Sequence, residues 1–323
     1  MTAEPRRPRW LGGLLRLFES PVTRLVAVTT LLVLIVRAVD SAAMRDAAQS
    51  ASWDLVVPAF LLMPVQVCWG AALWRRLARA VDPQARFLES LRALLGSLAV
   101  SIWTPARAGD FAARPTLMPR GSRRTLAVAV AAENVLRLPV PLVIAAPAAM
   151  VVGFTAYGLF AGAAIAVALL AVGLIWAPGA ATRIAGRFGA ERHVEFLHGL
   201  SGGERLRLIG GHGARYLLLV AQFMLVALAM SGPAEVGLLP MAAACTVVLA
   251  AKLMAPLLNF AELGIREGAS VVAFGAVGLS VEQALQASLL LYGMNVLVPA
   301  AVGAFYWLRS SRRDGQDPPA ANA

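Results

Sequence analysis

The chain has 323 residues, of which 59% are hydrophobic and 15% are charged, and its mean hydropathy is +0.70. Soluble domains carry about 25% charged residues. Apolar runs of about 18 residues or more, the length at which a helix crosses a bilayer, are typical of membrane proteins. The formal charge of +11 comes from arginines placed between such runs, which the positive-inside rule explains without nucleic acid as a partner. This balance argues against a soluble catalytic domain and against a nucleic-acid-binding protein. It predicts an all-α polytopic membrane helix bundle.

About eight apolar runs are predicted to span the membrane. In chain order they cover residues 22–39, 55–74, 125–152, 153–178, 216–230, 236–258, 268–279 and 284–308. A further run, 91–103, is too short for a comfortable crossing and is followed by Thr104 and Pro105, so we expect a re-entrant segment there. The first run is also preceded by basic residues and followed by small residues, as in a signal peptide. A signal peptide is therefore the alternative for that run.

The arginines indicate which side of the membrane each connection faces. They crowd the N-terminus, the loop after the second span, residues 107–124 and 182–215, and the C-terminal tail. All of these can lie in the cytoplasm only if the 91–103 segment enters and leaves from the cytoplasmic side. We therefore expect one integral membrane domain over 1–308, a disordered cytoplasmic tail over 309–323, and both termini inside. The Ala- and Arg-rich composition suits a bacterial protein.

Charged residues within apolar spans mark candidate sites, because each costs about 2.5–3.5 kcal/mol at the centre of a span. The first group follows the re-entrant run and contains Arg107, Asp110 and Arg114. Arg107 offers a planar guanidinium to a phosphate, and Asp110 can hold that guanidinium in place. Asp110 and Arg114 share a helix face at i,i+4 spacing. The alternative is an interfacial loop whose arginines only enforce the topology.

The second group is Glu133 and Arg137, again at i,i+4 spacing and about two turns into a predicted span. A carboxylate at that depth is expected to pair with an arginine or to be protonated. Pro139 and Pro141 are expected to bend or interrupt the helix just beyond it. The alternative is an ion pair with a purely structural role.

The third group is centred on Arg266 and Glu267, between two apolar runs of the second half. It repeats the combination of a glycine, an arginine and a carboxylate at the mouth of a short helix. Two broken, charged segments at corresponding places in two halves predict an inverted repeat and a transporter-type site. Lys252 adds a cation one to two turns before Asn259, at which the charged segment begins. A plain cytoplasmic loop is the alternative.

The other reactive side chains form no pattern that indicates chemistry. His193, His198 and His212 are irregularly spaced in a polar stretch, and we expect them to be solvated. Cys68 and Cys245 lie in apolar runs and are expected to be small buried hydrophobes. There is no catalytic triad, phosphate-cradling loop or zinc-ligand motif, so we predict no catalytic residue, no cofactor and no metal.

At the charged groups the sequence resembles the lysylphosphatidylglycerol synthase transmembrane-region family. That family includes the flippase portion of multiple-peptide-resistance-factor proteins and hopanoid-biosynthesis-associated membrane proteins. The resemblance covers most of the chain from the second span onward. It is carried by Pro105-Ala106-Arg107-Ala108-Gly109-Asp110 with Arg114, by Glu133 in a following helix, and by Gly264-Ile265-Arg266-Glu267-Gly268.

The resemblance implies a protein with re-entrant helices that translocates or handles lipids in a bacterial cytoplasmic membrane. It also implies a central polar cavity for a lipid headgroup, lined by Arg107, Asp110, Arg114, Glu133, Arg266 and Glu267. The chain departs from the family pattern at Asp110, where a Glu is usual, at Asn134, where an Arg is usual, and at Glu262, where a Gly is usual. Arg137 is the candidate to replace the missing arginine one turn later.

The main hypothesis is therefore a non-enzymatic lipid translocase or lipid-handling transporter, whose partners are membrane lipids with an anionic or other polar headgroup. The aminoacyl-transferring domain of the two-part family members does not occur in this sequence, so we do not expect lipid aminoacylation. Two alternatives stay open. One is a membrane-embedded transferase that uses a carboxylate such as Glu133 or Glu267 as a base on a lipid-linked substrate. The other is an assembly subunit that binds anionic lipid, as a homo-oligomer or with a lipid-biosynthesis partner.

Overall fold

The computed structural model describes residues 49, 51–102, 104, 108–153, 157–187, 189–231, 236–254 and 262–314. The chain divides into two compact units, Met1–Gln49 and Ser50–Ala323, and the helices described below belong to the second. The predicted span at 22–39 and the predicted site residue Arg107 lie outside the described residues.

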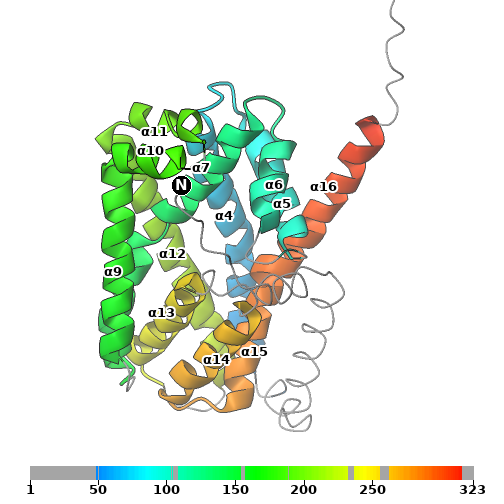
Figure 1. Cartoon of the computed structure of the whole chain (residues 1–323). Helices are drawn as coiled ribbons and strands as arrows, with labels where there is room; N and C mark the ends of the chain where they lie inside the picture. Colours follow the sequence, from blue (N-terminus) through cyan, green and yellow to red (C-terminus); the bar gives the residue numbers. More distant parts are fainter. Residues whose placement is uncertain are drawn as a thin grey trace, which may run out of the picture. The chain divides into compact units, whose positions relative to one another are not determined.

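The described part of the chain is helical and contains no strand (Figure 1). Its elements are α4 (Trp53–Ala78), α5 (Phe87–Ser101), α6 (Ala108–Leu117), α7 (Arg123–Leu136), α8 (Pro139–Val151), α9 (Tyr157–Trp176), α10 (Pro178–Gly186), η2 (Glu191–His193), α11 (Phe196–Gly199), α12 (Gly202–Ser231), α13 (Leu238–Met254), α14 (Glu262–Gly275), α15 (Val281–Tyr292), η4 (Gly293–Leu297) and α16 (Val298–Asp314). Five of the helical stretches are long and apolar enough to cross a membrane: α4, α7 with α8, α9, α12, and α15 with α16. This confirms the all-α polytopic bundle.

The short apolar run forms the hairpin that its length predicted. α5 and α6 pack against each other, and both lie in the upper half of the bundle in Figure 1. The start of α6 lies close to the end of α5, and there the backbone N–H of Gly109 donates to the Thr104 hydroxyl at 2.7 Å. A Cβ atom at Gly109 would lie 2.7 Å from that hydroxyl oxygen. The segment thus enters and leaves at one end of the bundle.

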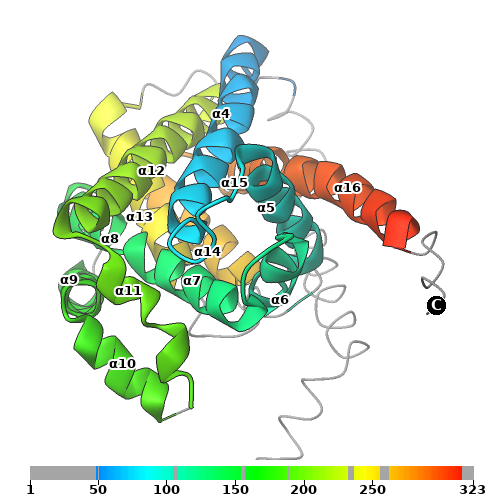
Figure 2. The same ribbon diagram turned by 90° about the horizontal axis from the view of Figure 1, so that it is seen from above.

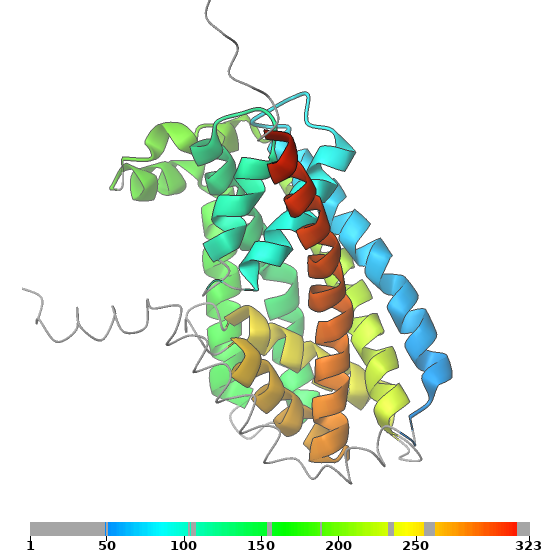
Figure 3. The same ribbon diagram turned by 90° about the vertical axis from the view of Figure 1, so that its right-hand side faces the viewer.

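A second hairpin occupies the opposite end, where the sequence predicted two full spans. α13 has 17 residues and α14 has 14, or roughly 26 and 21 Å at 1.5 Å per residue, against a hydrocarbon core of about 30 Å. The two helices pack against each other and lie in the lower half of the bundle (Figures 1 and 3). The apolar character of these two helices was predicted correctly, but the sequence analysis did not predict that each is too short to cross the membrane.

The two halves repeat in inverted order. α4 and α12 run antiparallel, with the backbone N–H of Ser52 donating to the carbonyl of Ala229 at 2.9 Å near one end of the pair. Each of these spans is followed by a hairpin and then by an interrupted span: α7 and α8 break at Pro139, whereas α15 and α16 are joined by the π-helical turn η4. The packing is reciprocal, since α5 packs on α16 and α13 on α8, while α6 packs on α7 and α14 on α15. This is the inverted repeat that the echo of charged groups predicted.

Three further expectations need correction. The stretch 182–215 is not a loop: it forms α10, η2, α11 and the first part of α12. Of these, α10 and α11 lie at the edge of the bundle in Figure 2. α16 continues to Asp314, past the start of the predicted tail at residue 309. Cys245 is buried as expected, but Cys68 is exposed on the outer face of α4, where its apolar neighbours face the lipid.

The arginine-rich segments lie at a common end of the bundle. α10, α11, the C-terminal ends of α4, α6 and α16 and the start of α7 are all at the top in Figure 1. This arrangement agrees with the charge count that placed those segments on one side of the membrane. It also brings the mouth of the α5–α6 hairpin to the same side.

Candidate functional site

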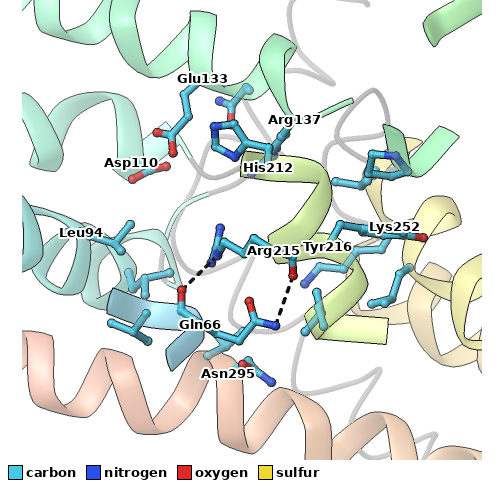
Figure 4. A pocket seen from close by; sticks show the side chains of 18 of the residues that line it. Gln66, Leu94, Asp110, Glu133, Arg137, His212, Arg215, Tyr216, Lys252 and Asn295 are labelled. Atoms are coloured by element: carbon cyan, nitrogen blue, oxygen red, sulfur yellow. Dashed lines mark hydrogen bonds between the residues drawn. The ribbon is translucent and has the colours of Figure 1, made fainter. Parts of the chain in front are cut away.

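A polar cavity of about 200 Å³ lies where α4, α5, α6, α7, α8, α12, α13 and η4 converge (Figure 4). Its ionisable lining consists of Asp110, Arg114, Glu133, Arg137, His212, Arg215, Tyr216 and Lys252. Among these described lining residues four side chains are cationic and two are carboxylates, which gives them two net positive charges with the histidine neutral. Four of the predicted site residues, Asp110, Arg114, Glu133 and Arg137, are therefore brought together.

Arg114 is the centre of a buried ion-pair triad on one wall of the cavity. Its Nε and NH2 atoms donate to the two carboxylate oxygens of Asp110 at 3.0 and 2.7 Å, one turn earlier on α6. Its NH1 atom donates to Oε2 of Glu133 on α7, and its guanidinium lies 4.9 Å from the ring of Trp74. The i,i+4 pair of Asp110 and Arg114 is confirmed. Removing one member of such a buried network typically costs about 3–5 kcal/mol, because the remaining charges lose their partner.

Glu133 pairs with an arginine, as its depth in the span predicted, and that arginine is Arg114 of α6. Arg137 is the C-cap residue of α7, and its backbone N–H donates to the carbonyl of Glu133 at 3.1 Å. Its side chain lines the same cavity. The helix ends here because Pro139 is the first residue of α8, and a proline has no N–H to continue the ladder.

The opposite wall is formed by residues that the sequence analysis did not select. Gln66 on α4 and Arg215 on α12 exchange hydrogen bonds: Nε2 of Gln66 donates to the Arg215 carbonyl at 3.3 Å, and Nε of Arg215 donates to the Gln66 carbonyl at 3.0 Å. Gly70 makes room for this contact, because a Cβ atom there would lie 3.1 Å from the Arg215 guanidinium carbon. A single glutamine inside the apolar run 55–74 was the signal that could have identified this wall.

His212 corrects the expectation that all three histidines are solvated. It is 4% exposed and lines the cavity from α12, whereas His198 is exposed and His193 is half-buried. The error follows from treating residues 182–215 as a loop. On a helix, His212 and Arg215 are three residues apart and share one face, which places both on the cavity side.

Arg266 and Glu267 form a separate buried cluster and are not among the described residues that line the cavity. They form an ion pair with each other. Nε of Arg266 donates to the Ser288 hydroxyl at 2.9 Å, and the guanidinium lies 4.6 Å from the ring of Tyr292. The sequence analysis placed all of its charged groups in one cavity. The described residues divide them between two places, one in each half of the repeat.

The cavity has the properties of an anion-binding site. Arg137, Arg215 and Lys252 contribute cations in addition to the triad, and arginine is well suited to bidentate contacts with phosphate. A volume of about 200 Å³ is below the roughly 300–1,000 Å³ of pockets that hold drug-sized ligands. It is therefore suited to a small charged group rather than to a whole lipid. No group of three or more His, Cys, Asp or Glu side chains that could hold a metal ion occurs among the described residues.

Comparison with known proteins agrees with these features. A family model described as the lysylphosphatidylglycerol synthase TM region matches residues 22–303. No curated protein and no solved structure gives a significant match.

Proposed function

Because the chain belongs to the lysylphosphatidylglycerol synthase transmembrane-region family, we propose that this multi-pass membrane protein translocates lipids with an anionic headgroup. The observation that carries the proposal is the cavity with two net positive charges between the inverted halves of the bundle. Charges within a membrane domain are costly and are retained where they line a path for a polar substrate. A lipid phosphate carries the negative charge that complements the cationic side chains lining this cavity.

The proposed binding mode divides the lipid between two environments. The phosphate occupies the cavity against Arg137, Arg215 and Lys252, while the Arg114 triad holds the hairpin in place. The acyl chains stay outside, in contact with exposed apolar side chains such as Leu61 and Val65 of α4. The small volume of the cavity is consistent with this division, because only the headgroup needs to leave the lipid.

The inverted repeat offers a route for movement. In transporters with this architecture, one half rocks against the other around a fixed site near the midplane. Here the hairpins enter from opposite ends, and both interrupted spans border the cavity through Pro141 of α8 and Asn295 of η4. In this proposal the charged side chains bind and position the lipid, and none acts as a catalytic group.

The proposed location is a bacterial cytoplasmic membrane, with both termini and the arginine-rich end of the bundle on the cytoplasmic side. The common placement of the arginine-rich segments supports this orientation. Membrane lipids are the proposed partners. A homo-oligomer or a lipid-biosynthesis partner is compatible with the proposal.

Reconstitution tests the function directly. Purified protein is placed in liposomes with a fluorescent anionic phospholipid, and the fraction reached by a membrane-impermeant quencher is followed. The wild-type protein is expected to expose label from the inner leaflet. Arg215→Gln is expected to slow exposure about tenfold or more, because a charge-assisted hydrogen bond contributes about 1.5–3 kcal/mol and tenfold is about 1.4 kcal/mol.

Arg207→Gln is the matched control, since Arg207 lies on the same helix but is exposed; its rate should equal that of the wild type. Lys252→Gln probes the same wall from α13, which guards against a folding defect in the α12 variant. Exposure that is equally fast in both cavity variants would contradict the site. No exposure with anionic, zwitterionic or hopanoid-like lipids would contradict translocation itself.

A further inference from the structure

The buried cluster on α14 contains a carboxylate that is only half satisfied. Oε1 of Glu267 accepts hydrogen bonds from Arg266 and lies 3.4 Å from the Ser288 hydroxyl. Oε2 is buried and has no hydrogen-bond partner among the described residues, and the whole Glu267 residue is 4% exposed. Buried polar atoms are nearly always paired. An orphan carboxylate oxygen in such a place therefore indicates a binding position for something that the side chains do not supply.

We propose that Oε2 of Glu267 binds a proton when a headgroup anion forms an ion pair with Arg266. Lipid translocation is thereby coupled to proton movement. The inference rests on the proposed function. While Glu267 is ionised, it neutralises Arg266. When a phosphate pairs with the Arg266 guanidinium, Glu267 is left as a buried charge without its partner, which is strongly unfavourable. A proton on Oε2 restores neutrality, so one proton accompanies each anion.

A proton fits this position better than a metal ion does. A metal cation needs several oxygen ligands, whereas a proton needs one oxygen. The Arg266 guanidinium also hydrogen-bonds the same carboxylate, at 3.1 Å from Nε to Oε1, and would repel a second fixed cation. No cluster of three or more potential metal-binding side chains occurs in the described ranges.

Among the described side chains, Arg266 is the cation that contacts Glu267. α14 itself also carries Glu262, four residues before Arg266. α14 packs against α13 and α15. From α15, Ser288 contacts both Arg266 and Glu267, and Tyr292 lies under the guanidinium. α15 carries one carboxylate, Glu282, in its first turn. α13 carries two titratable side chains, Cys245 and Lys252, and Lys252 lines the cavity.

The cluster is close enough to the cavity for an anion to affect both. Tyr292 is the last residue of α15 and Asn295 lies three residues later on η4, which is about one helical turn or 5 Å along the axis. Asn295 lines the cavity. In this proposal the headgroup moves from the cavity past Asn295 and Tyr292 to Arg266, whose guanidinium lies 4.6 Å from the Tyr292 ring.

The test uses the same liposomes with a pH difference of one unit across the membrane and the electrical potential clamped by potassium and valinomycin. With one proton per lipid, the leaflet ratio of labelled anionic phospholipid is expected to shift about tenfold. Glu267→Gln is expected to equilibrate the label between the leaflets, with a leaflet ratio that does not change with the pH gradient. Glu282→Gln, the same substitution on the neighbouring helix, is the matched control and should keep the full shift.

The outcomes separate the two proposals. Label exposure that ignores the gradient in the wild type would overturn coupling while leaving translocation intact, and a full shift in Glu267→Gln would overturn the assigned residue. A shift that follows sodium in place of protons would replace the proton with a metal cation. Absence of exposure under all conditions would instead be a failure of translocation.

A second measurement covers a Glu267→Gln variant that does not fold. Wild-type protein in weakly buffered detergent is mixed with glycerophosphoglycerol, a phosphodiester that does not titrate near neutral pH, and proton uptake is followed with a pH dye. About one proton per bound phosphodiester is expected. Binding without proton uptake would contradict the proposal.

Discussion

The two hairpins hold an arginine in the same architectural position but with different partners. In the first, Arg114 of α6 has two carboxylates, Asp110 and Glu133, and lies against Trp74. In the second, Arg266 of α14 has one carboxylate and one hydroxyl, Ser288, and lies against Tyr292. The first cluster carries one net negative charge and is fully tied to α7. The described members of the second add up to a neutral cluster, and Oε2 of Glu267 has no hydrogen-bond partner among the described residues, so this is the cluster in which partners can exchange.

The largest expected effect tests whether the first cluster is the structural one. Arg114→Gln removes the cation that Asp110 and Glu133 share, and we expect a loss of about 3–5 kcal/mol in the free energy of unfolding. Arg266→Gln leaves a single carboxylate and should cost less. Both are measured by denaturant titration in detergent, with the exposed Arg124→Gln as a control near zero. Equal losses in the two arginine variants would remove the proposed difference between the hairpins.

An intermediate effect tests the reciprocal packing of the halves. Gly303 on α16 packs closely against α5, and a Cβ atom there would lie 1.9 Å from the carbonyl oxygen of Leu95. Gly303→Ala must separate these helices, and we expect a loss of about 1–3 kcal/mol, the usual cost of overpacking. Gly173→Ala on α9 meets nothing within 4 Å and serves as the control in the same unfolding assay. An unaffected Gly303→Ala variant would mean that the α5–α16 contact is looser than its inverted counterpart.

The smallest expected effect concerns the Ser288 hydroxyl, the hydrogen-bond partner that distinguishes Arg266 from Arg114. The Ser288 hydroxyl accepts a hydrogen bond from Nε of Arg266 at 2.9 Å. In the other half, the corresponding partner of Arg114 is the carboxylate of Glu133. Ser288→Ala removes a hydrogen bond but no charge, so we expect a loss of about 0.5–1.5 kcal/mol and a retained response to the pH gradient. The same unfolding and liposome assays report both quantities. A lost gradient response would show that the hydroxyl, and not Glu267 alone, is needed to hold the exchanging pair.

Much of this arrangement could be predicted from the sequence, because the relevant signals are local. The length of the run 91–103 predicted a hairpin, and the spacing of Asp110 and Arg114 predicted their ion pair. Pro139 predicted a helix break. Each of these depends on residues within a few turns of one another, for which periodicity and proline chemistry are reliable guides.

What the sequence did not determine depends on contacts between distant segments. Glu133 had an arginine at i,i+4, yet its ion-pair partner is Arg114, from a different helix. Both possibilities have the same local pattern, and only the packing of α6 on α7 decides between them. The burial of His212 and the separation of Arg266 from the cavity likewise follow from how α12 and α14 pack, which no local pattern contains.

The exposed position of Cys68 makes the natural chain easy to follow by spectroscopy. The sequence has two cysteines, and the other, Cys245, has no exposed surface. A thiol-reactive fluorophore or spin label will therefore attach at one place, on the outer face of α4, without any substitution. The opposite face of the same helix carries Gln66, which binds Arg215. A label at Cys68 thus reports the tilt of α4 against α12 in real time while lipid is added.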